Sequence, residues 1–138
     1  MIAYLDTSAL LRLVLGEAGA LTGLLRAEVL VSSELLAVES LRTIDRLRLR
    51  GALSAEEASS RRATIDEWLE AVDLVLLQRS VLARASEPLP VALGTLDALH
   101  LATALVWRDR TQRPLVVATH DRDLALAARS FGFEVLGG

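Results

Sequence analysis

Cysteine and lysine are both absent from this sequence of 138 residues. Without cysteine the chain can form no disulfide, no thiolate metal site and no cysteine nucleophile. This absence is typical of a reducing compartment, so we expect a cytoplasmic protein. Without lysine the chain has no side-chain amine, which excludes P-loop NTPases and Schiff-base enzymes. All 15 basic side chains are therefore arginines.

Aromatic residues are scarce as well, at 4% of a chain that is 52% hydrophobic, so leucine, alanine and valine must build the core. No uncharged apolar run is long enough to span a membrane. No basic residues precede the first apolar stretch, which we therefore expect to be a core strand and not a signal peptide. The length suits one domain, placed at residues 1–138. The net charge of −3 argues against strong non-specific binding to nucleic acid but leaves room for a local basic face.

Short apolar segments alternate with helical patterns along the chain. The expected strands are Ile2–Leu5, Glu28–Val31, Asp73–Leu77, Leu115–Ala118 and Phe133–Leu136. The expected helices are Ala9–Leu15, Ala18–Ala27, Glu34–Arg50, a stretch from Ser54 to Ala71, Gln78–Ser86, Leu96–Arg108 and a last helix from Asp121 or Arg122 to Ser130. This alternation predicts an α/β three-layer sandwich, with a five-stranded parallel sheet flanked by helices and a helical hairpin at about residues 34–71.

Several residues mark the expected helix ends. Ser8 is a candidate N-cap of the first helix, and Ser32 or Ser33 of the helix Glu34–Arg50. Thr95 is a candidate N-cap of the helix Leu96–Arg108. Gly51 is a signal for a helix end. Ser54 and the glutamate three residues later have the spacing of a capping box.

Four acidic residues stand where strands end or helices begin. Asp6 ends the first strand and Asp121 follows the fourth, while Asp97 and Glu39 lie early in their helices. In an open parallel sheet, ligands bind outside the carboxyl ends of the strands. If the first and fourth strands are neighbours, the crevice between them brings these acids together.

Carboxylates packed this closely cannot all ionise without a cation. A hard divalent ion resolves the repulsion, and Mg²⁺ prefers oxygen ligands, with Mn²⁺ suited to the same set. Such an ion can activate water for hydrolysis of a phosphodiester.

Four motifs combine these acids in a recognisable order. They are Tyr4–Leu10 (YLDTSAL), Ala37–Arg42 (AVESLR), Leu96–Ala104 (LDALHLATA) and Thr119–Leu124 (THDRDL). Each is weak alone, but together, over nearly the whole chain, the sequence resembles the PIN-domain ribonucleases, and in particular the VapC toxins of bacterial toxin–antitoxin pairs.

The resemblance implies a function and a site. The expected function is a metal-dependent endoribonuclease, the toxin of a type II toxin–antitoxin pair, which hydrolyses RNA phosphodiester bonds with a metal-activated water. The implied catalytic and metal-binding residues are Asp6, Glu39, Asp97 and Asp121 around Mg²⁺ or Mn²⁺, supported by the hydroxyls of Thr7, Ser8 and Thr119. Asp123 departs from the family pattern, and we expect this fifth acid to serve as an alternative or outer ligand. It also implies a homodimer and a VapB-like antitoxin whose tail blocks the acidic groove.

Each acid alone has a structural explanation. Asp6 and Asp121 are suited to capping helices, and Asp97 gains from the helix dipole. Glu39 could pair with Arg42 or with Thr43 one turn further on. Four such coincidences at one place are less economical than one metal site.

The histidines, tryptophans and arginines are given structural roles. We interpret His100 as a packed residue with one hydrogen bond, and we leave His120 out of the site. Trp68 and Trp107 are interpreted as core or dimer-contact residues. The arginines of the hairpin are read as a solvated face that pairs with Glu56, Glu57 and Asp66. Arg42 is the exception: its position one turn from Glu39 makes it a candidate RNA contact, since arginine suits phosphate geometry.

Three alternatives remain. A phosphoryl-acceptor receiver domain is disfavoured because it needs a lysine. A haloacid-dehalogenase-type phosphatase would place a second aspartate where Ser8 stands. The alternative from a different class is a catalytically inactive PIN-like module that binds RNA or protein. It differs from the nuclease in having no tight Mn²⁺ site and no cleavage.

Overall fold

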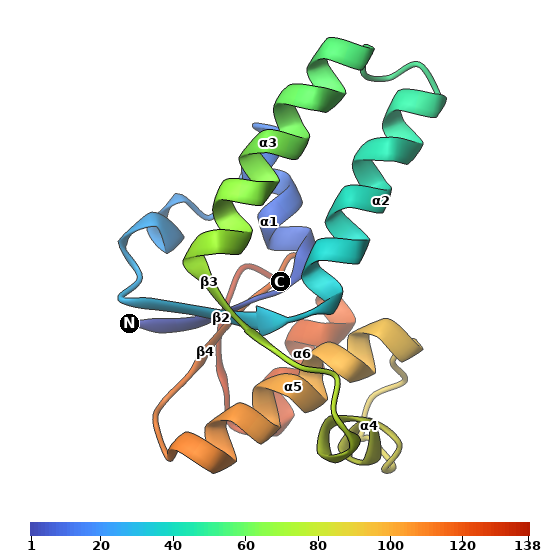
Figure 1. The fold of residues 1–138 in the computed structure, drawn as a ribbon. Coiled ribbons are helices and arrows are strands. Elements are labelled where there is room, and N and C mark those ends of the chain that lie inside the picture. Colours follow the sequence, from blue (N-terminus) through green and yellow to red (C-terminus); the bar gives the residue numbers. More distant parts are fainter.

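The computed structural model describes residues 1–138 as alternating strands and helices (Figure 1). The strands are β1 (Ile2–Leu5), β2 (Val29–Ser33), β3 (Val72–Val75), β4 (Val116–Ala118) and β5 (Glu134–Leu136). The helices are α1 (Thr7–Val14), α2 (Leu35–Leu49), α3 (Ala55–Ala71), α4 (Arg79–Ala85), α5 (Thr95–Thr111) and α6 (Arg122–Ser130), with a 3₁₀ turn at Thr22–Arg26. The α/β class predicted from the sequence is confirmed.

The five strands form one parallel sheet in the order β3-β2-β1-β4-β5. Tyr4 of β1 is in register with Val31 of β2 on one side and Val117 of β4 on the other. The chain therefore adds β2 and β3 on one side of β1, and then adds β4 and β5 on the other side. The crevice at the carboxyl ends of β1 and β4 is the topological switch point, as expected.

The two faces of the sheet bury two separate cores. Ala3 and Leu5 of β1 pack into a cluster with residues of α1, α2 and α3. Ile2 and Tyr4, on the opposite face, pack into a second cluster with residues of α5 and α6. This is the alternation of side chains along a strand covered on both faces. The result is the three-layer arrangement that Figure 1 shows, with the sheet between the two groups of helices.

Helices α2 and α3 form the predicted hairpin, which projects from the sheet (Figure 1). Gly51 allows the turn between them because its φ of 77° is in the left-handed region. The capping box at the start of α3 is present: the Ser54 hydroxyl accepts from the Glu57 N–H, and the Glu57 carboxylate accepts from the Ser54 N–H. The turn of the hairpin and the start of α3 thus lie where local chemistry predicts.

Several predicted boundaries are wrong by a few residues. Helix α1 begins at Thr7 and its N-cap is Asp6, so Ser8 is not the cap but lies in the first turn. Helix α5 begins at Thr95 itself, after an N-cap at Gly94, and continues to Thr111. The expected helix over residues 18–27 is only the short 3₁₀ turn, because Gly19, with a φ of 79°, interrupts the helical backbone.

The predicted start of the long helix is also wrong, because β2 is longer than expected. Ser32 and Ser33 are the last two residues of the strand, and the formal N-cap of α2 is Glu34. Ser33 still acts on the helix start, since its hydroxyl accepts from the Leu35 N–H at 3.1 Å. β3 spans 72–75, not 73–77. None of the helices combines the length and apolar character that crossing a membrane would require.

Candidate active site

All four predicted acids line one cleft at the switch point, which we call the acidic cleft. It has a volume of about 410 Å³, and its walls include Asp6, Glu39, Asp97 and Asp121 together with Thr7, Ser8 and Arg42. Asp6 comes from the end of β1, Glu39 from the second turn of α2, Asp97 from the first turn of α5 and Asp121 from the start of α6. The structure therefore brings together residues that are up to 115 positions apart in sequence.

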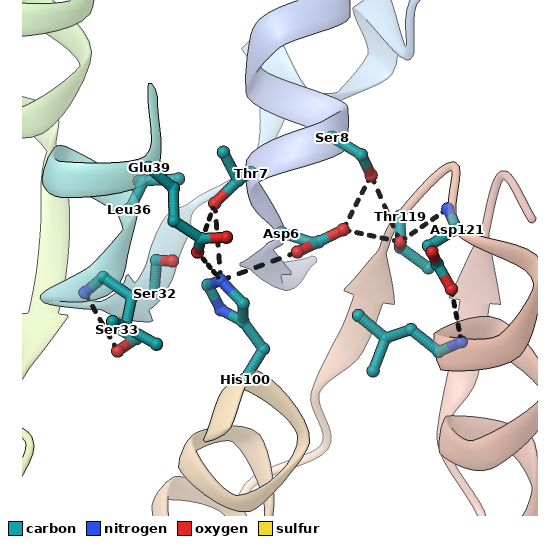
Figure 2. Close-up of polar contacts among 12 residues, drawn as sticks. Asp6, Thr7, Ser8, Ser32, Ser33, Leu36, Glu39, His100, Thr119 and Asp121 are labelled. Carbon is teal, nitrogen blue, oxygen red and sulfur yellow. Dashed lines mark hydrogen bonds and ion pairs between the residues drawn. The ribbon is translucent and has the colours of Figure 1, made fainter. Parts of the chain in front are cut away.

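Asp6 is the most enclosed of the four acids. It is 3% exposed, and one carboxylate oxygen, Oδ2, accepts hydrogen bonds from the hydroxyls of Ser8 at 2.6 Å and Thr119 at 2.7 Å. Figure 2 shows these two hydroxyls on one side of the carboxylate. Charge-assisted bonds of this kind are short and strong. Ser8 and Thr119 thus hold one oxygen and leave Oδ1 facing the rest of the site.

The same hydroxyls tie Asp6 to the turn that carries Asp121. The Thr119 Oγ1 accepts from the Asp121 N–H at 3.0 Å, and the Ser8 Oγ accepts from the His120 N–H at 2.9 Å. The Asp121 carboxylate caps α6 by accepting from the Leu124 N–H at 2.8 Å. The structural explanation of Asp121 as an N-cap is therefore correct, and the residue still faces the acidic cleft.

Glu39 does not make the contacts with its own helix that a surface residue would make. Its Oε1 accepts from the Thr7 hydroxyl at 3.0 Å and lies 2.6 Å from the Nε2 of His100. Partial burial favours the neutral carboxyl, but the hydrogen bond and charge of His100, with the Thr7 bond, outweigh it and lower the pKa of Glu39. Glu39 is therefore an ionised carboxylate directed into the site.

His100 is the residue that sequence reasoning missed. It is 1% exposed, and besides Glu39 it contacts the hydroxyl of Tyr4, 2.7 Å from Nδ1, while Nε2 lies 3.7 Å from Asp6 Oδ1. Burial alone would lower the pKa of His100, but the bond to Glu39 and the charges of Asp6, Glu39 and Asp97 outweigh burial and raise it. Its position three residues after Asp97, one helical turn on, was the available signal.

Asp97 differs from the other acids in its contacts. It is half-buried, and its carboxylate accepts no hydrogen bond within the chain. Burial raises its pKa to about 6, and the nearby charges of Asp121, Asp6 and Glu39 add to this rise, which His100 opposes. The repulsion among these carboxylates is the condition that a divalent cation relieves.

The donor set fits a hard cation in its chemistry, although the side chains as placed form no ready-made group of three or more metal ligands. Each anchored acid uses one oxygen for protein contacts: Oδ2 in Asp6, Oε1 in Glu39 and Oδ1 in Asp121. Their other oxygens, and both oxygens of Asp97, accept no hydrogen bond from the chain. Oxygen-only donors of this kind are those that Mg²⁺ and Mn²⁺ prefer.

The remaining predicted residues lie at or beyond the edge of the acidic cleft. Arg42 lines it, and its guanidinium pairs with Asp45 at 3.2 Å. Arg48 pairs with the same aspartate, and Arg61 donates to the Val14 carbonyl. No ion pair joins a hairpin arginine to Glu56, Glu57 or Asp66, so that expected pairing is wrong. Asp123 is exposed and lines a neighbouring cleft that shares Asp121.

The chain passes close to the site once more, near its last residues. Gly137 has a φ of 80°, and a Cβ built there would collide with the carbonyl oxygen of Thr119. Only glycine accommodates both the backbone conformation and this approach. The segment after β5 therefore packs directly against the residue that holds Asp6.

A family model described as PIN domain matches residues 3–130. The chain belongs to the PIN-domain family. The family predicted from the four motifs is thus confirmed over nearly the whole length of the chain. A comparison with curated protein sequences finds no significant match.

Three solved structures share the fold of this PIN domain. The structure of VapBC2 from Rickettsia felis, bound to a DNA fragment from its promoter, is 11% identical in sequence and has a TM-score of 0.69. The match covers 100% of this chain and 99% of the other. VapBC-1 from nontypeable Haemophilus influenzae is 14% identical with a TM-score of 0.61, covering 99% and 98%. VapBC-5 from Mycobacterium tuberculosis, a member of the VapBC family of toxin–antitoxin systems, is 16% identical with a TM-score of 0.60, covering 99% and 98%. At these identities the likeness establishes the fold.

Proposed function

We propose that this PIN domain is a metal-dependent endoribonuclease and the toxin of a type II toxin–antitoxin pair. The observation that carries the proposal is the acidic cleft, in which four carboxylates from four separate elements meet at the switch point of the sheet. Membership of the PIN-domain family supports nuclease chemistry. No other function in the sequence analysis requires these acids to converge.

The residues of the acidic cleft have distinct tasks in this proposal. Asp6, fixed by Ser8 and Thr119, and Glu39, fixed by Thr7, keep one carboxylate oxygen each directed at the reaction site. Asp97 and Asp121 complete the set from the opposite wall of helices. Held in this way, the carboxylates orient a water for in-line attack on a phosphodiester.

Asp6, Glu39, Asp97 and Asp121 would hold the divalent cation. When bound, Mg²⁺, or Mn²⁺ in its place, would supply the positive charge that lowers the pKa of water and offsets the negative charge developing on the phosphate. The raised pKa of Asp97 supports a site that is short of positive charge when the protein is alone.

The substrate is proposed to be RNA, held along the α2 edge of the acidic cleft. Arg42 lines that edge and is exposed, so its guanidinium can exchange Asp45 for a phosphate. The chain as a whole carries a net charge of −3. Binding of RNA must therefore depend on such local contacts and on the cation, not on a general basic surface.

A VapB-like antitoxin is the proposed protein partner, and a homodimer is the proposed assembly. The fold shared with three VapBC structures supports the antitoxin partner. The homodimer is proposed from the family resemblance alone. An antitoxin segment that lies in the acidic cleft would block the carboxylates and inhibit cleavage.

Cleavage of a mixed cellular RNA preparation by the purified, antitoxin-free protein tests the proposed function. Reactions contain Mg²⁺, Mn²⁺ or EDTA and are run beside Asp6→Asn. We expect discrete fragments that require the metal, with a loss of at least about 100-fold in the variant because it removes a charge from the metal-binding set. The fragment ends would then identify the target.

Asp109→Asn is the matched control, since it makes the same chemical change on the exposed side of α5. It should cleave like the unmodified protein. Unchanged cleavage by Asp6→Asn would refute the site. Intact RNA in every lane, together with no Mn²⁺ binding in titration calorimetry, would favour the inactive binding module instead.

A further inference from the structure

His100 makes more contacts than a core histidine needs. Its Nδ1 lies 2.7 Å from the Tyr4 hydroxyl, and its Nε2 lies 2.6 Å from Glu39 and 3.3 Å from the Thr7 hydroxyl. The ring also meets the Tyr4 ring edge-on, with centroids 5.8 Å apart. Figure 2 shows the imidazole between the carboxylates of Glu39 and Asp6. Both ring nitrogens therefore have polar partners, and Nε2 points into the acidic cleft.

The hydrogen-bonding chemistry fixes the direction of this chain of contacts. The Glu39 carboxylate can accept but not donate, so Nε2 must carry the proton in their 2.6 Å bond. The hydroxyl of Tyr4, which is buried in the second core, contacts the other nitrogen and so fixes the plane of the ring. A second partner of this kind orients a ligand that the first partner contacts.

We propose that His100 is a positioning residue that fixes the Glu39 carboxylate in the acidic cleft, through the chain Tyr4–His100–Glu39. This inference rests on the proposed function, because it assigns His100 a role at the same site. His100 holds Oε1 and leaves Oε2 for the cation. Glu39 stands on the projecting hairpin, and His100 on α5 anchors it to the opposite layer of the fold.

Titration calorimetry with Mn²⁺ on the purified full chain tests this role. His100→Leu is expected to weaken Mn²⁺ binding by about 10- to 100-fold, as loss of an outer hydrogen bond to a metal ligand does. His100→Gln keeps an N–H donor that can reach Glu39, so its affinity should stay within about threefold of the unmodified protein. Tyr4→Phe removes only the hydroxyl and should weaken binding by about 2- to 10-fold, the equivalent of one hydrogen bond.

A double-mutant cycle separates positioning from a general loss of structure. In a Glu39→Gln background, His100→Leu should change Mn²⁺ affinity by less than about twofold, because the residue it acts through is already altered. In RNA cleavage, the loss for His100→Leu should fall on kcat, with KM unchanged. If His100→Leu fails to fold, His100→Gln and Tyr4→Phe carry the test.

Ser40→Ala is the matched control. Ser40 is buried on α2 beside Glu39, and its hydroxyl donates to the Leu36 carbonyl and not to the site. It should alter stability without altering Mn²⁺ affinity. Full-strength or tighter Mn²⁺ binding by His100→Leu and Tyr4→Phe would overturn the positioning role while the nuclease stands. Absence of Mn²⁺ binding and cleavage in the unmodified protein would overturn both.

Discussion

Two of the four acids in the cleft are held firmly, and one is hardly held at all. Asp6 receives two hydroxyl hydrogen bonds, and Glu39 receives a hydroxyl and an imidazole. Asp97 receives none, although it lies in the same cleft. The pKa values respond accordingly: that of Glu39 is lowered, whereas that of Asp97 is raised to about 6.

The difference shows how a cleft lined by like charges can fold without a cation. Hydrogen bonds to the ionised form offset the cost of gathering Asp6 and Glu39, so the protein fixes those two in advance. Asp97 has no such hydrogen bond, and burial and the neighbouring charges raise its pKa. If the acids bind metal as proposed, two of them are fixed before the cation binds and Asp97 is not.

The largest effect is expected when an anchor of a held acid is removed. Thr119→Val keeps the shape but loses the hydroxyl that donates to Asp6 and accepts from the Asp121 N–H. Mn²⁺ affinity should fall by about 10- to 100-fold, and the free energy of unfolding by about 1–3 kcal/mol because a buried carboxylate and an N–H lose a partner. Calorimetry and urea denaturation measure the two.

Thr103→Val makes the same change in an equally buried threonine, which donates to the Leu99 carbonyl and not to an acid. It should leave Mn²⁺ affinity unchanged. Equal losses of Mn²⁺ affinity in both threonine variants would show that the effect does not come from the hydrogen bond to Asp6.

Burial of the Asp97 carboxylate, together with repulsion from the neighbouring acids, predicts a pH-dependent change in stability. In EDTA, Asp97→Asn should raise the free energy of unfolding at pH 7.5 by about 1 kcal/mol. The full shift in pKa corresponds to about 3 kcal/mol, which is reduced here because the side chain is half exposed. The folded pKa, about 6, lies above the ordinary value of 3.8. The penalty is therefore present above pH 6 and disappears as the pH falls toward 4.

Urea denaturation of both proteins at pH 7.5 and pH 4 measures this effect, with Asp109→Asn as the exposed control. An advantage of the same size at both pH values would rule out the ionised Asp97 carboxylate as its source.

The smallest effect is expected at Arg42, on the edge of the acidic cleft, because this residue contacts none of the four acids. Arg42→Gln should raise the KM for RNA by about 2- to 5-fold, the size of one exposed ionic contact, and leave Mn²⁺ affinity unchanged. Arg48→Gln is the control, because Arg48 shares the partner Asp45 but does not line the acidic cleft. If both variants raise KM equally, the effect comes from general charge and not from the cleft.

The sequence predicts most of what local chemistry decides. The first strand, Ile2–Leu5, and the capping box of α3 are found where expected, because apolar runs and caps act over a few residues. The four acids are found in one cleft because strand ends and helix starts share an edge of a parallel sheet. Their role as metal ligands stays a prediction.

The sequence does not predict hydrogen bonds between side chains, least of all those that are far apart along the chain. Ser8 looks like an N-cap, but its hydroxyl donates to Asp6. His100 lies in an apolar helix that suggests simple packing, yet its partners Glu39 and Tyr4 are 61 and 96 positions away. Nothing in a single sequence states such pairings, which arise only when the two layers of helices close on the sheet.

The close approach of Gly137 to Thr119 links the end of the described chain to its beginning. Any side chain at this exposed position would displace the Thr119 backbone and, with it, the hydroxyl on Asp6. In a survey of random substitutions, position 137 would therefore behave like an active-site residue while contacting neither substrate nor metal. Mutational intolerance at a surface glycine would here reflect the geometry of the Asp6 carboxylate, which lies at the far end of the sequence.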